Sequence, residues 1–243
     1  MMVAVILAAG VARRLYPLTY DRPKCLLEVG EKPIIDYQLE ALQSLGVSHV
    51  VLVVGYFREM VVAHAEHSFP EMTFSVITND HFFETNTAYS LYLCRETIRE
   101  SDILLMNADV LFPESLIQRV LHSPASNVLA VEPKPCGREE VKVIAGDGDR
   151  IVAIGKELIQ ENSLGEFIGV AKFSRSFNGK LSQSLTDLVE AGGKADYFEA
   201  AVHPLLATSN VSYVDISDLP SIEIDFLEDL ERARELVQKS PYR

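Results

Sequence analysis

The first half of the chain alternates short apolar runs with segments of helical periodicity, and this alternation restricts the fold more than any other feature. The apolar runs are VAVILA (3–8), HVVLVVG (49–55), TFSVITND (73–80) and DILLMNAD (102–109). The hydrophobic parts of the first, second and fourth runs are continuous, which is typical of strands covered on both faces, and the third run ends in polar residues. With helices predicted between them, the pattern indicates a parallel sheet in a doubly wound α/β domain.

The second half of the chain is richer in short β segments. Apolar stretches at 127–132, 140–156, 165–174 and 211–216 predict strands, and the GDGD sequence at 146–149 predicts a hairpin turn. Helices are expected at 181–192 and 197–207, and a short strand and a charged helix within 223–239. No linker rich in Pro or Gly divides the chain. We therefore predict one domain over residues 1–243, built as three layers around a mostly parallel, mixed sheet.

The overall charge excludes two classes of partner. The chain has 243 residues and a formal net charge of −13. Binding of nucleic acid needs a broad basic face, and docking on anionic membranes needs clustered positive charge, so we expect neither partner.

No apolar run approaches the roughly 20 residues of a membrane span, and the apolar N-terminus lacks the basic residues that begin a signal peptide. Three scattered cysteines, Cys25, Cys94 and Cys136, indicate reduced thiols and a cytoplasmic location.

Against this negative balance, four basic residues gather after the first strand: Arg13, Arg14, Arg22 and Lys24. Gly10 precedes them and allows the backbone to approach a phosphate chain. Arginine and lysine supply charge for phosphate oxygens. The segment matches neither the Walker A loop nor the G-x-G-x-x-G dinucleotide motif. The alternative is a surface loop with solvated basic side chains.

Polar residues also end two later strands. Asp109 closes an apolar strand, where a carboxylate can hold Mg²⁺, although Asp is also a good N-cap for the helix that follows. Asp225 stands at a similar junction between strand and helix and has the same two interpretations. Since ligands of open α/β sheets bind at the carboxyl ends of strands, the first loop, the 79–86 segment and the Asn107–Asp109 segment should lie together.

The first loop resembles a known signature. LAAGVARRLYPLTYDRPKCLLEVGEKPII (7–35) is similar to the signature of nucleotidyltransferases that join an NTP to a phosphorylated small molecule and release pyrophosphate. NAD (107–109), FIGVAKFS (167–174) and EIDFLEDLERA (223–233) extend the resemblance. NDHFFETNTAYSLYL (79–93) resembles cytidylyltransferases of the phosphocholine type. Ala12 and Arg13 depart from the pattern, which more often has Gly and then Ser or Thr.

The resemblance implies a Rossmann-like nucleotidyltransferase fold and a division of roles. Residues 1–125 form the nucleotide-binding half and 126–243 the acceptor-binding half. CTP is the favoured nucleotide, a phosphocholine-like compound the acceptor and Mg²⁺ the cofactor. Arg14 and Lys24 would be catalytic, and Asp109 and Asp225 would hold the metal. The implied nucleotide-binding residues are Ala8, Ala9, Gly10, Arg13, Asn79, Thr85, Asn86, Thr87 and Asn107. The implied acceptor-binding residues are Lys156, Gly169, Tyr89, Tyr197 and Glu199.

Several alternatives stay open at this stage. The acceptor could be a sugar 1-phosphate or inositol phosphate, with UTP, dTTP or GTP in place of CTP. A non-catalytic nucleotide-sensing subunit and a glycosyltransferase are further possibilities. Thr85 or Asn86 could simply cap a helix, Lys156 could be a solvated loop lysine, and the aromatic residues near the acceptor end, Phe167 and Phe198 included, could belong to the core. A homodimer with the helix around Glu199 in its contact is also possible.

Overall fold

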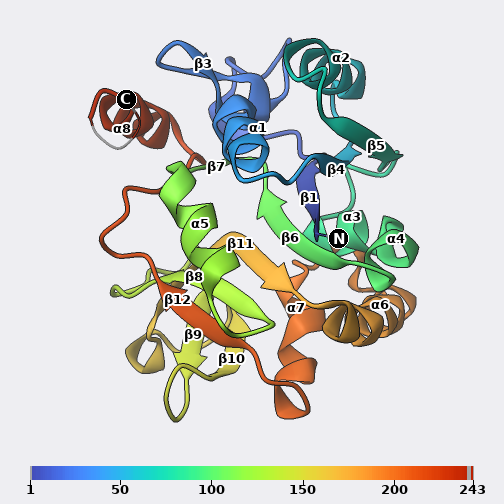
Figure 1. The fold of residues 1–243 in the computed structure, drawn as a ribbon, viewed down its shortest axis with the longest axis vertical. Coiled ribbons are helices and arrows are strands. Elements are labelled where there is room, and N and C mark those ends of the chain that lie inside the picture. Colours follow the sequence, from blue (N-terminus) through green and yellow to red (C-terminus); the bar gives the residue numbers. More distant parts are fainter. Residues whose placement is uncertain (1, 240–241, 243) are drawn as a thin grey trace.

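The computed structural model describes residues 2–239 and 242 (Figure 1). Within them, one nine-stranded sheet runs through both halves of the sequence in the order β10-β9-β11-β6-β1-β4-β5, and β8 and β12 continue from β11. Its strands are β1 (Met2–Ala8), β4 (His49–Val54), β5 (Thr73–Thr78), β6 (Asp102–Asn107), β8 (Val128–Glu132), β9 (Lys142–Ala145), β10 (Ile151–Gly155), β11 (Gly165–Phe173) and β12 (Ser212–Asp215).

The direction of the strands changes where the two halves of the sequence meet. β1 pairs in parallel with β4 and β6, and β4 pairs in parallel with β5. β11 then runs antiparallel to β6, β8 and β9. The predicted mixed sheet is therefore confirmed. Most of its parallel pairing lies in the first half of the chain, and β8 and β12 form one further parallel pair in the second half.

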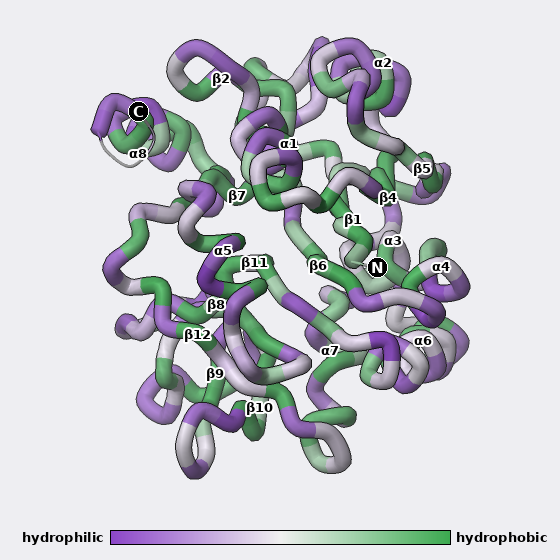
Figure 2. Tube along the Cα trace, in the orientation of Figure 1, coloured by the Kyte–Doolittle hydropathy of each residue, from purple (hydrophilic) through white to green (hydrophobic). Residues whose placement is uncertain are grey.

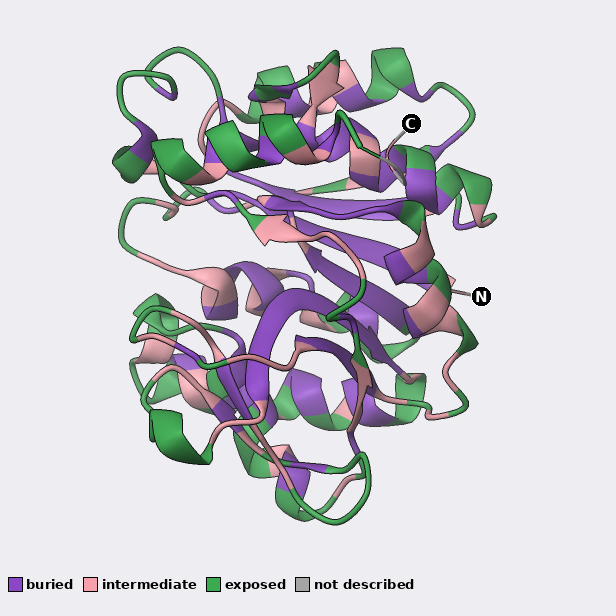
Figure 3. Ribbon diagram, turned by 90° about the vertical axis from the view of Figure 1, so that its left-hand side faces the viewer, coloured by how far each residue is buried: buried purple, intermediate pink, exposed green. Residues whose placement is uncertain are grey.

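Helices cover both faces of the sheet, as the continuous apolar strands predict. Along β1, Ala4 and Ile6 face one core while Val3 and Val5 face the other, because successive side chains of a strand point to opposite faces. One face is covered by α1 (Ile34–Ser44), α2 (Arg58–Ser68) and α5 (Glu114–His122). The other is covered by α3 (Thr87–Leu93), α4 (Arg95–Arg99), α6 (Arg175–Glu190) and α7 (Glu199–Val202). The central strands β1, β4 and β6 are apolar and buried between helices whose outer faces are exposed, whereas the edge strand β5 is only partly covered (Figures 2 and 3).

The C-terminal part of the described chain returns to the N-terminal half. A short ribbon pairs β7 (Val110–Leu111) with β13 (Ile222–Glu223) in antiparallel register. It leads into α8 (Leu227–Leu236), whose Leu230 and Ala233 pack in a third core. That core also contains residues of β2 (Glu28–Val29) and α1, next to β3 (Lys32–Pro33). α8 therefore lies beside the β2–β3 and α1 region, although these segments are far apart in the sequence (Figure 1).

Two predicted helices are not continuous. The helix predicted between the apolar runs 73–80 and 102–109 is split into α3 and α4 at Cys94, whose N–H donates to the carbonyl of Leu91 in a tight turn. The helix expected at 197–207 consists of α7 and a 3₁₀ segment at His203–Ala207, because Pro204 has no N–H for the helical ladder. Among the described helices, none combines the length and the apolar character needed to cross a bilayer.

Candidate active site

A cavity of about 360 Å³ opens at the carboxyl ends of β1, β5 and β6. It is bounded by the loop after β1, the turn before α3, the middle of β11 and the β7–β13 ribbon. The predicted site residues that line it are Ala8, Ala9, Gly10, Arg13, Arg14, Lys24, Asn79, Thr85, Asn86, Thr87, Asn107, Asp109, Lys156, Gly169, Tyr197, Glu199 and Asp225. Segments far apart in sequence thus share one concave surface, as the rule for open α/β sheets predicts.

The loop after β1 leaves open space at its glycine. Gly10 is exposed, and a Cβ placed there would meet no atom within 4 Å. The fold therefore does not require glycine at this position, whereas close approach of a ligand to the backbone would. Ala12 is held in the left-handed region at φ 52, where the resembled signature more often has Gly. A hydrogen bond of 3.0 Å from Thr19 Oγ1 to the Ala12 carbonyl supports this conformation.

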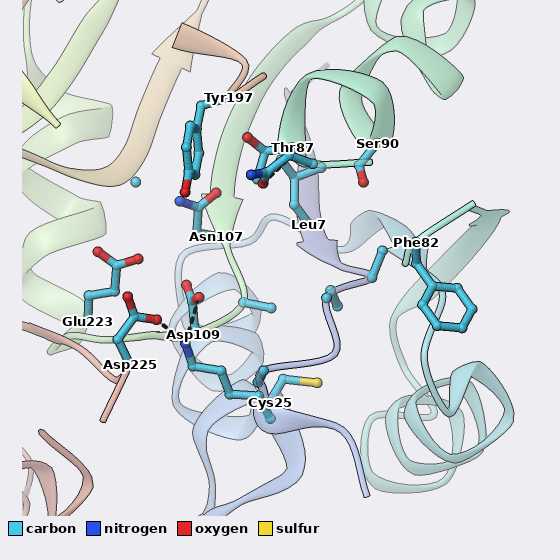
Figure 4. A pocket seen from close by; sticks show the side chains of 18 of the residues that line it. Leu7, Cys25, Phe82, Thr87, Ser90, Asn107, Asp109, Tyr197, Glu223 and Asp225 are labelled. Atoms are coloured by element: carbon cyan, nitrogen blue, oxygen red, sulfur yellow. Dashed lines mark hydrogen bonds and ion pairs between the residues drawn. The ribbon is translucent and has the colours of Figure 1, made fainter. Parts of the chain in front are cut away.

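The β7–β13 ribbon brings three carboxylates together. Its register places Val110 opposite Glu223, and the N–H of Ile224 donates to the carbonyl of Asp109 at 3.0 Å. Carboxylate oxygens of Asp109, Glu223 and Asp225 consequently lie within 4.8 Å of one another, and Figure 4 shows the three side chains gathered on one side of the cavity. Glu223 is a residue that the sequence reasoning missed. Its position two before Asp225 in an extended segment was the available signal, since residues i and i+2 share a face.

Neither aspartate caps a helix. α5 begins after Pro113 without a side-chain cap. The N–H groups of Asp225 and Phe226 donate to the carboxylate of Asp229 at 3.1 and 2.9 Å. The carboxylates of Asp109 and Asp225 therefore remain directed into the cavity, and the capping alternative is wrong for both.

Lys24 joins the two aspartates. Its Nζ lies 3.0 Å from Asp109 Oδ2 and 2.7 Å from Asp225 Oδ1. Arg14 donates to the other oxygen of Asp225 at 2.9 Å and reaches Glu139 at 3.5 Å. Burial lowers the pKa of Lys24, but the charges of Asp109 and Asp225 outweigh burial and raise it above its ordinary value. Burial likewise opposes ionisation of Asp225, but Lys24 and Arg14 hold its pKa below the usual range.

The carboxylates have the chemistry of a magnesium site. Hard divalent cations prefer carboxylate oxygens, and Mg²⁺ commonly takes one or two of them together with phosphate oxygens. Within the described residues, Asp109 Oδ1 is buried and has no hydrogen-bond partner. Burial, and then the charges of Asp109 and Asp225, raise the pKa of Glu223 to about 8, so a cation bound beside it would favour the ionised form of Glu223. The donor set therefore fits Mg²⁺.

The turn before α3 is held by its own side chains. Asn79 is buried and donates to Thr85 Oγ1 at 3.0 Å and to Ser90 Oγ at 3.2 Å, while its oxygen accepts from the His81 N–H. Asn86 caps α3 by accepting from the N–H of Thr87, as the capping alternative predicted. These contacts give Asn79 and Asn86 a role in shaping this wall of the cavity.

The other end of the cavity holds a buried acid. Glu199 is 3% exposed, and among the described residues its Oε2 has no hydrogen-bond partner. Burial raises the pKa of Glu199 to about 7, partly opposed by Lys156. Lys156 Nζ lies 4.2 Å from the centre of the Tyr197 ring. This region therefore offers an acceptor oxygen, an ammonium and an aromatic ring.

Gly169 is required by the packing of this region. Its φ is +80°, and a Cβ there would lie 2.5 Å from Asn107 Nδ2. Asn107 Oδ1 is buried without a hydrogen-bond partner in the described part of the chain. Glycine at 169 thus allows the Asn107 amide to reach the cavity wall.

Tyr89 is a predicted acceptor residue that the structure does not bring to the cavity. Its half-buried ring stacks on Tyr92 with centroids 5.8 Å apart, because Ala88 and Leu91 are the α3 residues that face the core. Phe198 is fully buried and packs edge-on against Phe167, so it belongs to the core. Further lining residues that the sequence reasoning did not identify include Cys25, Phe82, Ser90, Val141 and Glu223.

Comparisons with known proteins show the family to which the chain belongs. The chain is 27% identical over 239 residues to a choline-phosphate cytidylyltransferase of Streptococcus pneumoniae, covering 98% of this chain and 99% of the relative. It is 25% identical over 252 residues to a CTP:phosphoglutamine cytidylyltransferase of Campylobacter jejuni, covering 95% and 98%. The solved inositol-1-phosphate CTP transferase of T. maritima has the same fold, with a TM-score of 0.81 at 24% identity over 98% of this chain and 96% of that one. The model of the MobA-like NTP transferase domain matches residues 4–212. With most of its length matched, this chain belongs to the MobA-like NTP transferase family.

Proposed function

We propose that this protein transfers a cytidylyl group from CTP to a small phosphorylated or phosphonate acceptor and releases pyrophosphate. The observation that carries the proposal is the position of Lys24, between Asp109 and Asp225 and in the same cavity as Gly10. A cation-lined glycine loop facing a carboxylate cluster is what a triphosphate and its metal require.

The reaction needs charge and orientation rather than a general base. An acceptor phosphate has its second pKa near 6, so its oxygen is already ionised at pH 7. It attacks the α-phosphorus in line as the bond to pyrophosphate breaks. Lys24 and Arg14 stabilise the charge that develops on the phosphoryl oxygens and the leaving pyrophosphate. Arg13, whose guanidinium lies 5.4 Å from the Phe83 ring, is a further cation at the cavity wall.

Asp109, Asp225 and Glu223 are the residues that would hold Mg²⁺. The bound ion would neutralise phosphate charge and polarise the α-phosphoryl group. Without that ion, Lys24 balances the same carboxylates, so it keeps Asp109 and Asp225 close together.

Two observations support CTP as the nucleotide and an acceptor with a polar or cationic end. The relatives that span nearly the whole chain are named for cytidylyl transfer to choline phosphate and to phosphoglutamine. The orphan oxygen of Glu199 can accept a hydrogen bond from an ammonium or hydroxyl group of the acceptor. Lys156 would bind the acceptor phosphate, which leaves the Tyr197 ring to contact the rest of the acceptor.

Turnover of a matrix of nucleotides and acceptors tests the proposal. CTP, UTP, dTTP and GTP are combined with phosphocholine, 2-aminoethylphosphonate, inositol 1-phosphate and glucose 1-phosphate in the presence of Mg²⁺, and pyrophosphate release is measured. CTP with an amine-bearing acceptor should give the highest kcat/KM. Equal rates with UTP or dTTP would refute the cytidylyl assignment, and preference for glucose 1-phosphate would favour a sugar-phosphate enzyme.

Loss-of-function variants separate an enzyme from a sensing subunit. Lys24→Ala and Asp109→Asn should each lower turnover by about 10²-fold or more, whereas a subunit that only binds nucleotide would show no turnover to lose. Sedimentation of the same protein tests the predicted homodimer.

A further inference from the structure

Lys142 is a buried lysine outside the cavity lining. It lies on β9 and is 1% exposed. In the described part of the chain its ammonium makes three hydrogen bonds, all to backbone carbonyls: Arg138 at 3.4 Å, Glu140 at 3.1 Å and Lys156 at 2.6 Å. Burying an ammonium costs free energy unless hydrogen bonds compensate for the lost water, and these three carbonyls provide that compensation.

The three carbonyls belong to two segments that border the cavity. Arg138 and Glu140 flank Glu139, which reaches Arg14 at 3.5 Å. Lys156 follows the last residue of β10, where Gly155 pairs with Lys142 in the antiparallel register. The ammonium therefore links the loop before β9 to the chain just after β10, beyond the end of the strand pairing.

The link fixes the backbone from which Lys156 extends. Lys156 lines the cavity, and its Nζ lies 4.2 Å from the Tyr197 ring. A long side chain can place its charge accurately only when its own backbone is held, and small misplacements of a binding group are costly in rate. We infer that Lys142 is a positioning residue for acceptor binding: through the carbonyl of Lys156 it sets where the Lys156 ammonium meets the acceptor phosphate. This inference rests on the proposed function of the cavity.

The chain offers a matched control. Lys172 on β11 is 9% exposed, and its ammonium also donates to two backbone carbonyls, Leu121 at 3.2 Å and Ser123 at 2.9 Å. It tethers the end of α5 and does not line the cavity. Lys142→Met and Lys172→Met both remove a buried ammonium, but only the first should affect acceptor binding.

Steady-state kinetics with CTP and the best acceptor give the first test. K142M should raise KM for the acceptor about tenfold and leave KM for CTP within twofold, and K172M should change neither. In a Lys156→Met background, K142M should add less than twofold, because both substitutions then act on one group. An equal rise in both KM values, a full effect in the K156M background, or the same effect from K172M would overturn the inference. Should K142M be insoluble, K142Q, which keeps two N–H donors, takes its place and should give a smaller acceptor effect in the same direction.

Hydrogen exchange keeps this test separate from the proposed function. Backbone amides of 154–157 should exchange faster in K142M than in wild type and be unchanged in K172M. If wild type turns over none of the nucleotide and acceptor pairs, the proposed function fails, and the exchange pattern still decides whether Lys142 holds the Lys156 backbone. Unchanged exchange at 154–157 in K142M would refute the inference whatever the activity.

Discussion

Lys24 Nζ lies 2.7 Å from Asp225 Oδ1, across 201 positions of sequence. The side chain of Lys24 is only 11% exposed, so its end of the ion pair is shielded from water, whereas Asp225 is 34% exposed. It joins the basic loop after β1 to the acidic ribbon at the other end of the chain. The pair therefore defines the cavity, and its removal should affect stability and catalysis together.

Lys24→Met should lower kcat by about 10² to 10³-fold, the effect of removing one preorganised group that stabilises transition-state charge. In EDTA it should also reduce the free energy of unfolding by about 1–3 kcal/mol, because Asp109 then loses its cation and Asp225 keeps only Arg14. Pyrophosphate release and urea unfolding measure the two effects. Lys180→Met, on the exposed face of α6, serves as the control and should change neither. A stable K24M protein with wild-type kcat would contradict the assignment of Lys24.

Mg²⁺ should stabilise the EDTA-treated protein. At 100 times its Kd, an ion that binds only the folded state adds about 2.7 kcal/mol to the free energy of unfolding. Asp109→Asn should abolish the rise in Tm with Mg²⁺, and Glu223→Gln should reduce it, since each removes one carboxylate of the cluster. Asp218→Asn, which alters an exposed carboxylate paired with Arg119, should keep the full rise. Retention of that rise in D109N would place the metal elsewhere.

Alanine substitutions at two glycines should have opposite effects: one should weaken nucleotide binding and the other should lower stability. Gly10→Ala introduces a Cβ into open space, so we expect an unchanged Tm and a higher KM for the nucleotide. Gly169→Ala combines a φ of +80° with a contact of 2.5 Å to Asn107, so it should lower the free energy of unfolding by about 1–3 kcal/mol. Thermal unfolding and nucleotide titration distinguish them. A G10A protein with wild-type nucleotide affinity would show that no ligand approaches this loop.

Glu199 should make stability depend on pH. Burial raises its pKa from 4.5 to about 7, so the folded state favours the protonated acid. The contribution of protonated Glu199 to the free energy of unfolding is therefore fully present below about pH 4.5 and is lost as the pH rises through about 7. Glu199→Gln removes this dependence, so E199Q should match wild type near pH 4 and exceed it at pH 8, by an amount on the order of 3 kcal/mol. Urea unfolding of both proteins across this range is the measurement, and a difference independent of pH would count against it.

Local patterns in the sequence were enough to predict much of the fold. The apolar strands of the first half could be identified because strands buried on both faces have few polar residues. The loop from Gly10 to Lys24 was identified by its signature, and the end of β6 at Asp109 by the change from apolar to acidic residues. The breaks at Cys94 and Pro204 are local events, and the second of them could have been predicted from the missing proline N–H.

The tertiary structure decided which residues from distant segments lie close together. Glu223 joins Asp109 through the register of the β7–β13 ribbon, and Tyr89 turns away from the cavity because the packing of α3 selects its neighbours for the core. Lys142 donates its hydrogen bonds to backbone carbonyls, which every residue has. The identity of the residues that accept these bonds therefore could not reveal the contacts from the sequence. Sequence determines which chemistry each segment carries, because propensity and polarity act over a few residues. Pairing and packing act between segments hundreds of residues apart, and they determine which of these chemistries face one another.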